Sequence, residues 1–253
     1  MIIHRLTLTP ESLATLPSNE RALLNVIGHA LNEMNVVLKL FLLSSNYDFE
    51  PPVVRHAQLC QTMVLSKLLV GKVHEIWSVL QKGYFGTGLS KTYRVDLESE
   101  HLDALDKLKK YFGRKNVVES VRNQFAFHYS LEHAAPAPGP DTPADALAIY
   151  FGTTVGNSLY QFAEQSMGMA MLDGIDAKDP QRAYDRLFME TREVASWLDT
   201  IGQGILFAIL ERHTSITSRR NELEPIDLGP VAQSKNVRIP FFFEAVLDDE
   251  GRS

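Results

Sequence analysis

Residues 18–42, SNERALLNVIGHALNEMNVVLKLFL, decide the fold because their apolar side chains recur with the period of an α-helix. The spacing i, i+3, i+4, i+7 continues for about six turns and predicts a long amphipathic helix with one apolar stripe along its length. The stripe consists of Leu23, Val26, Ile27, Ala30, Leu31, Met34, Val37, Leu38, Phe41 and Leu42. We expect this helix to bury its stripe against other helices.

The same pattern predicts further helices over residues 53–82, 99–112, 116–127 and 181–216. Pro51-Pro52 can open the first of these, because proline is tolerated in a first turn. Gly113 can end the helix over 99–112, and Asp179-Pro180 combines an N-cap with proline at the first helical position. Long helices joined mostly by short loops predict an all-α fold, a mainly antiparallel helix bundle.

The remaining segments are expected to be accessory to this bundle. Residues 134–144 carry four prolines and a glycine, which predict an irregular loop. Within 146–175, apolar residues flank a Gly152–Gly156 turn and predict a small β-hairpin insertion, although a helix beginning near Asn157 is the alternative. We expect the C-terminal residues to form an extended tail along the bundle. We expect residues 1–253 to form a single domain.

Composition narrows the class of protein and its compartment. The chain is 45% hydrophobic and 22% charged, as in ordinary soluble proteins, and its one cysteine, Cys60, excludes an internal disulfide. The N-terminus lacks a secretory pattern and no run reaches 18 apolar residues, so we expect a cytoplasmic protein that does not span a membrane. The net charge of -6 argues against broad attraction to nucleic acid.

The side chains best suited to binding or catalysis are concentrated in residues 118–129, VESVRNQFAFHY. An ideal helix would place Arg122 and His128 about 120° apart on a face that also carries Val121 and Phe125. A bound group, or a second copy of this face across a two-fold axis, could contact both side chains. A structural alternative is that His128 is a core residue and that Arg122 pairs with a carboxylate such as Glu119.

Arg122-Asn123, followed after four further residues by His128, resembles the motif of the HEPN superfamily, the higher eukaryotes and prokaryotes nucleotide-binding domains. The resemblance covers seven residues, and the all-α bundle expected here is similar to that family's fold. It implies a metal-independent endoribonuclease completed by homodimerisation, with toxin or antiphage relatives. It also implies RNA or a nucleotide as ligand, a possible antitoxin or regulatory protein as partner, and no metal or cofactor.

In that interpretation Arg122, Asn123 and His128 are catalytic and Tyr129 contacts substrate. Cleavage by the 2′-hydroxyl needs a group that transfers protons and a cation that stabilises the charge on the phosphorane. His128 can supply the proton transfer and Arg122 the cation. Asn123 would orient the phosphate or His128. Two alternatives remain: a non-catalytic HEPN-like nucleotide-binding or scaffold protein, and a helical interaction protein without an active site.

Other motifs predict structural roles. Glu98-x-x-His101 is a single copy at a helix start, whereas a di-iron bundle requires two copies and two further glutamates. His29 and Glu33 are spaced as a surface pair on one helix. Lys67 and Lys72 lie along the second helix, where they could guide an RNA backbone or simply be solvated.

Overall fold

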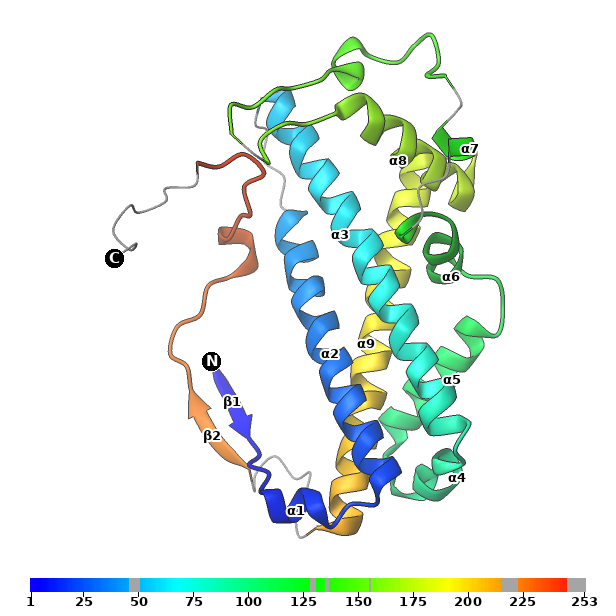
Figure 1. The fold of residues 1–253 in the computed structure, drawn as a ribbon, viewed down its shortest axis with the longest axis vertical. Helices are drawn as coiled ribbons and strands as arrows, with labels where there is room; N and C mark the ends of the chain where they lie inside the picture. The colour runs from blue at the N-terminus through cyan, green and yellow to red at the C-terminus, as the bar shows by residue number, and fades with distance from the viewer. Residues whose placement is uncertain (46–50, 128–130, 135–136, 155, 215–222, 245–253) are drawn as a thin grey trace, which may run out of the picture.

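Three long helices form the centre of the protein. The computed structural model describes residues 1–45, 51–127, 131–134, 137–154, 156–214 and 223–244. In Figure 1, α2 (Ser18–Ser44), α3 (Pro52–Val79) and α9 (Pro180–His213) lie side by side along the long axis, and α2 and α3 run in opposite directions. The prediction of an all-α helix bundle is therefore confirmed.

Shorter elements surround these helices. They are β1 (Ile2–Arg5), α1 (Pro10–Ala14), α4 (Leu89–Tyr93), α5 (Ser99–Phe112), α6 (Val117–Val121), α7 (Leu131–Ala134), α8 (Gln161–Asp176) and β2 (Glu224–Asp227). Two π-helical turns, η1 (Leu80–Phe85) and η3 (Arg122–Ala126), continue α3 and α6. The 3₁₀ turns are η2 (Arg94–Asp96), η4 (Ala144–Leu147) and η6 (Ser234–Asn236).

The core lies where α2, α3 and α9 meet. Its fully buried side chains from these helices include Ile27, Met34, Leu69, Val73, Ile76, Val194, Leu198, Ile201 and Ile205. Gly202 allows α9 to approach α2 closely, because a Cβ there would lie 2.7 Å from Leu31 Cδ1. One residue of the predicted stripe, Val26, is instead exposed.

The cap signals read from the sequence act as predicted. Asp179 accepts a hydrogen bond from the Arg182 amide at the start of α9, and Pro180 is its first residue. Gly113 follows the last residue of α5. At the start of that helix Glu98 and His101 form a capping box, with the Glu98 amide donating to His101 Nδ1 at 3.2 Å. The Glu-x-x-His motif is thus part of a helix start.

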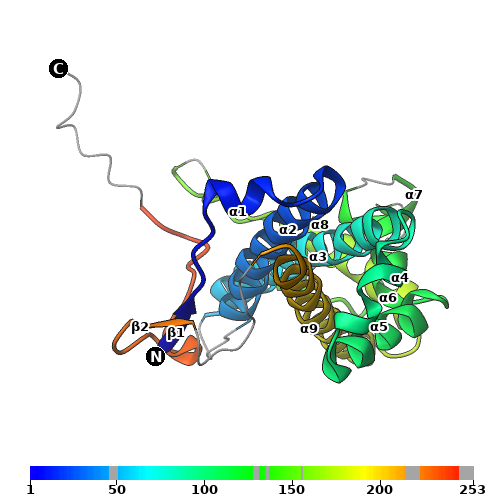
Figure 2. The same ribbon diagram turned by 90° about the horizontal axis from the view of Figure 1, so that it is seen from below.

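The second layer covers one side of the three-helix core. Figure 2 looks along the bundle and shows α4, α5 and α6 on the side of α3 and α9 away from the β-strands. Trp77 of α3 stacks on Phe112 of α5, with ring centroids 4.8 Å apart. This packing fixes where the chain re-enters the bundle at α6.

The two termini are joined by a β-ribbon. Strands β1 and β2 pair antiparallel, with Ile2 opposite Asp227 and Arg5 opposite Glu224. Arg5 Nη2 donates to Glu224 Oε1 at 2.8 Å across this ribbon. Farther along the tail, the Phe243 amide donates to Asn157 Oδ1 at 3.0 Å. The described part of the tail therefore lies along the bundle, as expected.

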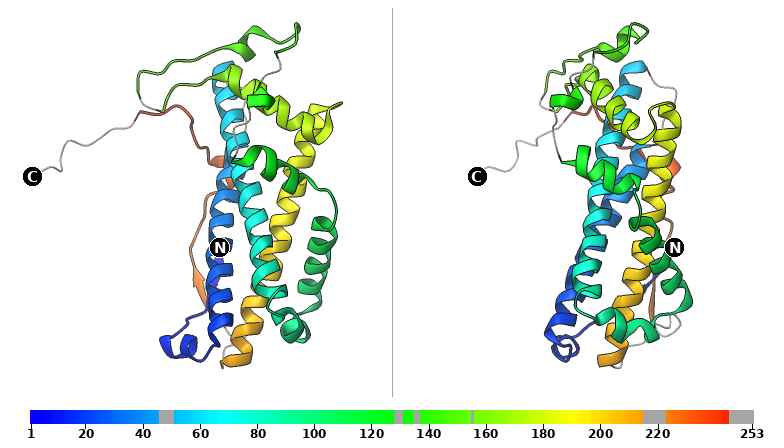
Figure 3. Two further views of the ribbon diagram at one scale, coloured as in Figure 1. Left: turned by 45° about the vertical axis from the view of Figure 1, so that its right-hand side comes forward. Right: turned by 90° about the vertical axis from the view of Figure 1, so that its right-hand side faces the viewer.

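Residues 146–175 differ from the predicted hairpin insertion. One antiparallel bridge joins Tyr150 to Leu159, and the alternative helix follows as α8 from Gln161. Figure 3 shows α8 running beside the upper part of α3 and leading toward α9. Helix α8 packs against α3 and α9 and buries Met171 there. The prolines of the 134–144 segment lie in irregular backbone or outside the described residues.

A polar cluster closes the end of the bundle where α1, α4 and the C-terminus of α9 meet. Glu20 accepts a hydrogen bond from the buried Tyr93 hydroxyl, and its Oε2 lies 2.7 Å from His213 Nε2. Arg212 covers the Tyr93 ring and forms an ion pair with Asp96 at 3.0 Å. The cluster ties the start of α2 to the end of α9.

Two helices also have the length and composition of membrane spans. The apolar windows of α2 and α9 are 22% and 56% buried, respectively. Burial inside the bundle explains why the α9 segment is apolar. The α2 segment is less buried, and it leaves an apolar outer face that includes Val26 and Val36. The cytoplasmic location therefore stays a prediction.

Candidate functional site

The motif region begins as a short helix anchored in the core. Asn116 caps α6 by accepting a hydrogen bond from the Glu119 amide at 2.8 Å. Val117, Val118 and Val121 are buried, so this turn packs tightly against the bundle. Figure 3 shows α6 beside α3. The buried valines fix the position from which Arg122 projects.

The backbone changes form at Arg122. The predicted continuous helix over 116–127 is instead α6 followed by the π-helical turn η3, and Phe127 leaves helical geometry with φ of -139°. A π turn adds a residue to the helical repeat, so positions after Val121 are rotated from their α-helical places. The predicted 120° relation of Arg122 to His128 assumed an ideal helix over residues 116–127, and the described backbone departs from an ideal helix between Arg122 and Phe127. His128 and Tyr129 lie outside the described residues.

Arg122 lies at the surface, where two side chains hold it. Its side chain is 36% exposed; Nη2 donates to Glu75 Oε1 at 3.3 Å, and Nη1 donates to Asn123 Oδ1 at 3.2 Å. Glu119 instead accepts from Asn116 Nδ2. The predicted neighbours Arg122 and Asn123 are therefore in contact, and the carboxylate partner is Glu75 of α3 rather than Glu119. The guanidinium is not sealed in the core.

His74 is a neighbour that the sequence analysis did not find. Its side chain is 19% exposed, and Nδ1 lies 3.8 Å from the same Glu75 oxygen that Arg122 contacts. Burial, and then the positive charge of Arg122, lower the pKa of His74 below its ordinary value. The imidazole is therefore neutral at pH 7. No sequence signal connects residues 74 and 122, because only the packing of α6 on α3 brings them together.

Phe127 places the end of the motif on α3. A Cβ at Gly71 would lie 2.8 Å from Phe127 Cζ, so the aromatic ring occupies the space that a side chain at position 71 would fill. Gly71 is about one turn before His74 and Glu75 on the same helix. Residue 127, which directly precedes His128, is therefore held against the part of α3 that carries the Arg122 partners.

Phe125 anchors the same turn from its buried side. It is 8% exposed and stacks on His133, with ring centroids 4.8 Å apart. The Cβ position of Gly174 in α8 lies 3.6 Å from the Phe125 ring. The turn is thus fixed between α3 and α8, with Arg122 and the exposed Asn123 directed outward.

Three of the other candidates, His29, Glu33 and Lys72, form ion pairs with one another at the surface. His29 is 76% exposed and lies 3.7 Å from Glu33, which also pairs with Lys72 at 2.9 Å. Lys72 is therefore held by a carboxylate. Among the described residues, no three His, Cys, Asp or Glu side chains come together as a metal site.

Comparisons with protein-family models, with curated proteins and with solved structures found no match for the chain. The site is thus defined by its own geometry: a partly exposed arginine, an amide, a neutral imidazole and a carboxylate on the outer side of the packed α3–α6 pair.

Proposed function

We propose that this protein is a metal-independent endoribonuclease that binds the scissile phosphate with Arg122 and transfers protons with His128. The observation that carries the proposal is the placement of Arg122, which is positioned by Glu75 and Asn123 yet open to solvent. A planar guanidinium can donate two parallel hydrogen bonds to a phosphate. The motif's resemblance to HEPN ribonucleases supports the same chemistry.

In this mechanism the 2′-hydroxyl attacks the adjacent phosphorus and the bond to the leaving 5′-oxygen breaks. His128 protonates the leaving oxygen or accepts the 2′-hydroxyl proton, and Arg122 stabilises the charge on the phosphorane. Asn123 orients the guanidinium through its Oδ1 contact. Tyr129 is proposed to contact the substrate. His74 has no proton-transfer role in this proposal, which assigns proton transfer to the motif residue His128.

We further propose that a homodimer completes the site, with Arg122 of one chain meeting His128 of the other across a two-fold axis. Mixing Arg122→Ala with His128→Ala tests this arrangement. If each site takes Arg122 from one chain and His128 from the other, random exchange should restore about one quarter of wild-type activity. Two variants that stay inactive after subunit exchange would contradict the shared site.

RNA incubated with the protein in EDTA tests the chemistry. We expect products with 2′,3′-cyclic phosphate and 5′-hydroxyl ends, and a rate that falls about 10² to 10⁴-fold in His128→Ala. His29→Ala is the matched control, because His29 is an exposed histidine paired to one carboxylate. Cleavage that disappears in EDTA and survives His128→Ala would refute the assignment.

A second function is favoured by one contact. Glu75 already occupies Arg122, and an RNA phosphate has to compete with that carboxylate. This arrangement suits the alternative of a non-catalytic HEPN-like scaffold protein, in which the Arg122–Glu75 pair is kept and contacts a partner protein. Intact RNA after incubation with the wild-type protein, together with no loss of RNA binding in Arg122→Ala, would favour this function over the first.

A further inference from the structure

Phe127 is an exposed aromatic residue at the end of the proposed site. It is 57% exposed, whereas Phe125 of the same turn is 8% exposed and packs toward α8. Single exposed apolar residues are ordinary in soluble proteins, so exposure alone assigns no role to Phe127. Its role follows from the way in which the ring is held and from the groups beside it.

The Phe127 ring stands with one edge on α3. The Cβ position of Gly71 is nearest to Cε2 of the ring and lies 2.8 Å from Cζ and 3.7 Å from Cδ2. These distances place the Cβ position in the plane of the ring, beyond the edge that joins Cε2 and Cζ. More than half of the residue is exposed although this edge is covered, so at least one face of the ring is open to solvent.

The ring and the Arg122 guanidinium lie on neighbouring turns of α3. Gly71, under the ring, and Glu75, which pairs with Arg122 at 3.3 Å, are four positions apart. Residues with this spacing share one face of a helix, and each turn advances by about 5.4 Å. An aromatic face and a cation that can bind phosphate are therefore about one helical turn apart, which is within the reach of a single nucleotide.

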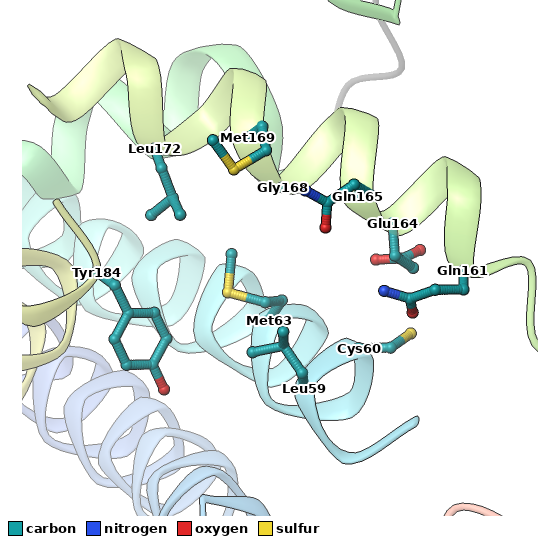
Figure 4. A pocket seen from close by; sticks show the side chains of 10 residues that line it. All are labelled: Leu59, Cys60, Met63, Gln161, Glu164, Gln165, Gly168, Met169, Leu172 and Tyr184. Atoms are coloured by element: carbon teal, nitrogen blue, oxygen red, sulfur yellow. The ribbon is translucent and has the colours of Figure 1, made fainter. Parts of the chain in front are cut away.

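The pocket between α3 and α8 is too small to enclose a nucleobase. Figure 4 shows this pocket, with Met63 of α3 facing Met169 and Leu172 of α8. Its volume is about 80 Å³, whereas a cavity of roughly 150 Å³ holds benzene, a ring smaller than any nucleobase. The Phe127 ring, in contrast, is an open surface on which a base can lie.

The charge of the chain gives stacking a large share of RNA binding. The net charge is -6, and Glu75 already pairs with Arg122, so attraction to phosphates alone is weak. Stacking of one base on an aromatic side chain needs no net positive charge and raises affinity by about 5- to 100-fold.

We propose that Phe127 is a stacking platform for an unpaired base, and that the Arg122 site therefore takes single-stranded RNA. This inference rests on the RNA site proposed above, in which Arg122 binds a phosphate. In a duplex both faces of each base are covered by neighbouring bases, so no base face is left for the ring. Phe127 positions the RNA and takes no part in proton transfer.

Binding of two non-cleavable oligomers to the full chain tests the platform. Oligo-2′-O-methyluridylate lacks the attacking 2′-hydroxyl, and its abasic counterpart keeps the phosphates but has no bases. We expect the wild-type protein to bind the uridylate at least about fivefold more tightly than the abasic oligomer or the duplex with oligoadenylate. Phe127→Leu should bind both single strands equally weakly, because leucine is apolar but has no ring. The matched control Phe151→Leu, at a 78% exposed phenylalanine between η4 and α8, should keep the wild-type preference.

Cleavage of oligouridylate in EDTA, measured beside binding, separates this proposal from the ribonuclease. If the wild-type protein and Phe127→Leu cleave equally fast at subsaturating RNA, the platform is refuted and the ribonuclease stands. If neither protein cleaves but the preference for the uridylate disappears in Phe127→Leu, the ribonuclease is refuted and the platform stands. Equal affinity of the wild-type protein for the uridylate and the abasic oligomer overturns the platform without any variant, so the test does not depend on the folding of Phe127→Leu.

Discussion

Substituting Gly71 by alanine should have opposite effects on stability depending on Phe127. The new Cβ would lie 2.8 Å from Phe127 Cζ, so the ring has to leave α3. Phe127 is 57% exposed, so it buries about 80 Å² of the roughly 200 Å² that a phenylalanine can bury. This buried area becomes exposed to water when the ring leaves α3. At about 25 cal/mol per Å² this loss costs up to about 2 kcal/mol.

The helix itself gains from the same substitution, because alanine exceeds glycine in helix propensity by up to about 1 kcal/mol. Gly71→Ala alone should therefore destabilise the protein by about 1 kcal/mol, whereas the same change in Phe127→Ala should stabilise it by up to about 1 kcal/mol. Urea denaturation of the wild-type protein, Gly71→Ala, Phe127→Ala and the double variant measures the coupling energy between positions 71 and 127 directly. Equal effects of Gly71→Ala in both backgrounds would show that Phe127 does not lie on α3.

Three further changes test other parts of the structure. Tyr93→Phe removes the buried hydroxyl that donates to Glu20 and should lower the free energy of unfolding by about 1 to 3 kcal/mol in urea denaturation. A loss under about 0.5 kcal/mol would show that the Tyr93 hydroxyl does not bind Glu20 in the folded protein. His74→Gln should flatten the pH dependence of the free energy of unfolding. Because the pKa of His74 is lowered in the folded protein, its contribution to stability is fully present above the unfolded pKa of about 6.5 and is lost as the pH falls below that value. The same dependence of stability on pH in the wild-type protein and in His74→Gln would refute the burial of a neutral His74. Glu75→Gln should strengthen RNA binding, because it removes the carboxylate that competes for Arg122. The free energy of unfolding should change by no more than about 1 kcal/mol, since Glu75 is 60% exposed. Weaker RNA binding by this variant would mean that Glu75 helps to hold the RNA.

The long helices could be predicted from the sequence because local signals specify them. The apolar period in residues 18–42, the Asp179-Pro180 start and Gly113 each act within a few residues of where they occur. The second long helix was predicted to reach residue 82, and the structure has α3 to Val79 followed by η1. Helical periodicity does not distinguish an α turn from a π turn, because both place apolar residues on the packed side.

The site was harder to predict because its contacts join distant residues. Arg122 and Glu75 are 47 positions apart, and the neutral state of His74 depends on burial by α6 packing. In the sequence, Gly71 is only an interior glycine of the second long helix, and its role became visible only with Phe127 in place. Similarly, the apolar residues that flank the Gly152–Gly156 turn made a hairpin the favoured prediction, whereas the structure forms one bridge there and begins α8 at Gln161.

The most direct test of the ribonuclease proposal is the rate of RNA cleavage in EDTA by wild-type protein, Arg122→Ala and Arg182→Ala. Arg182 is the matched control, because it is an exposed arginine whose Nε lies 3.7 Å from one carboxylate, that of Asp176. We predict cleavage by the wild-type protein and Arg182→Ala, and a loss of at least about 100-fold in Arg122→Ala. Equal cleavage by all three proteins would contradict a role for Arg122, and an RNA left intact by the wild-type protein would contradict the ribonuclease itself.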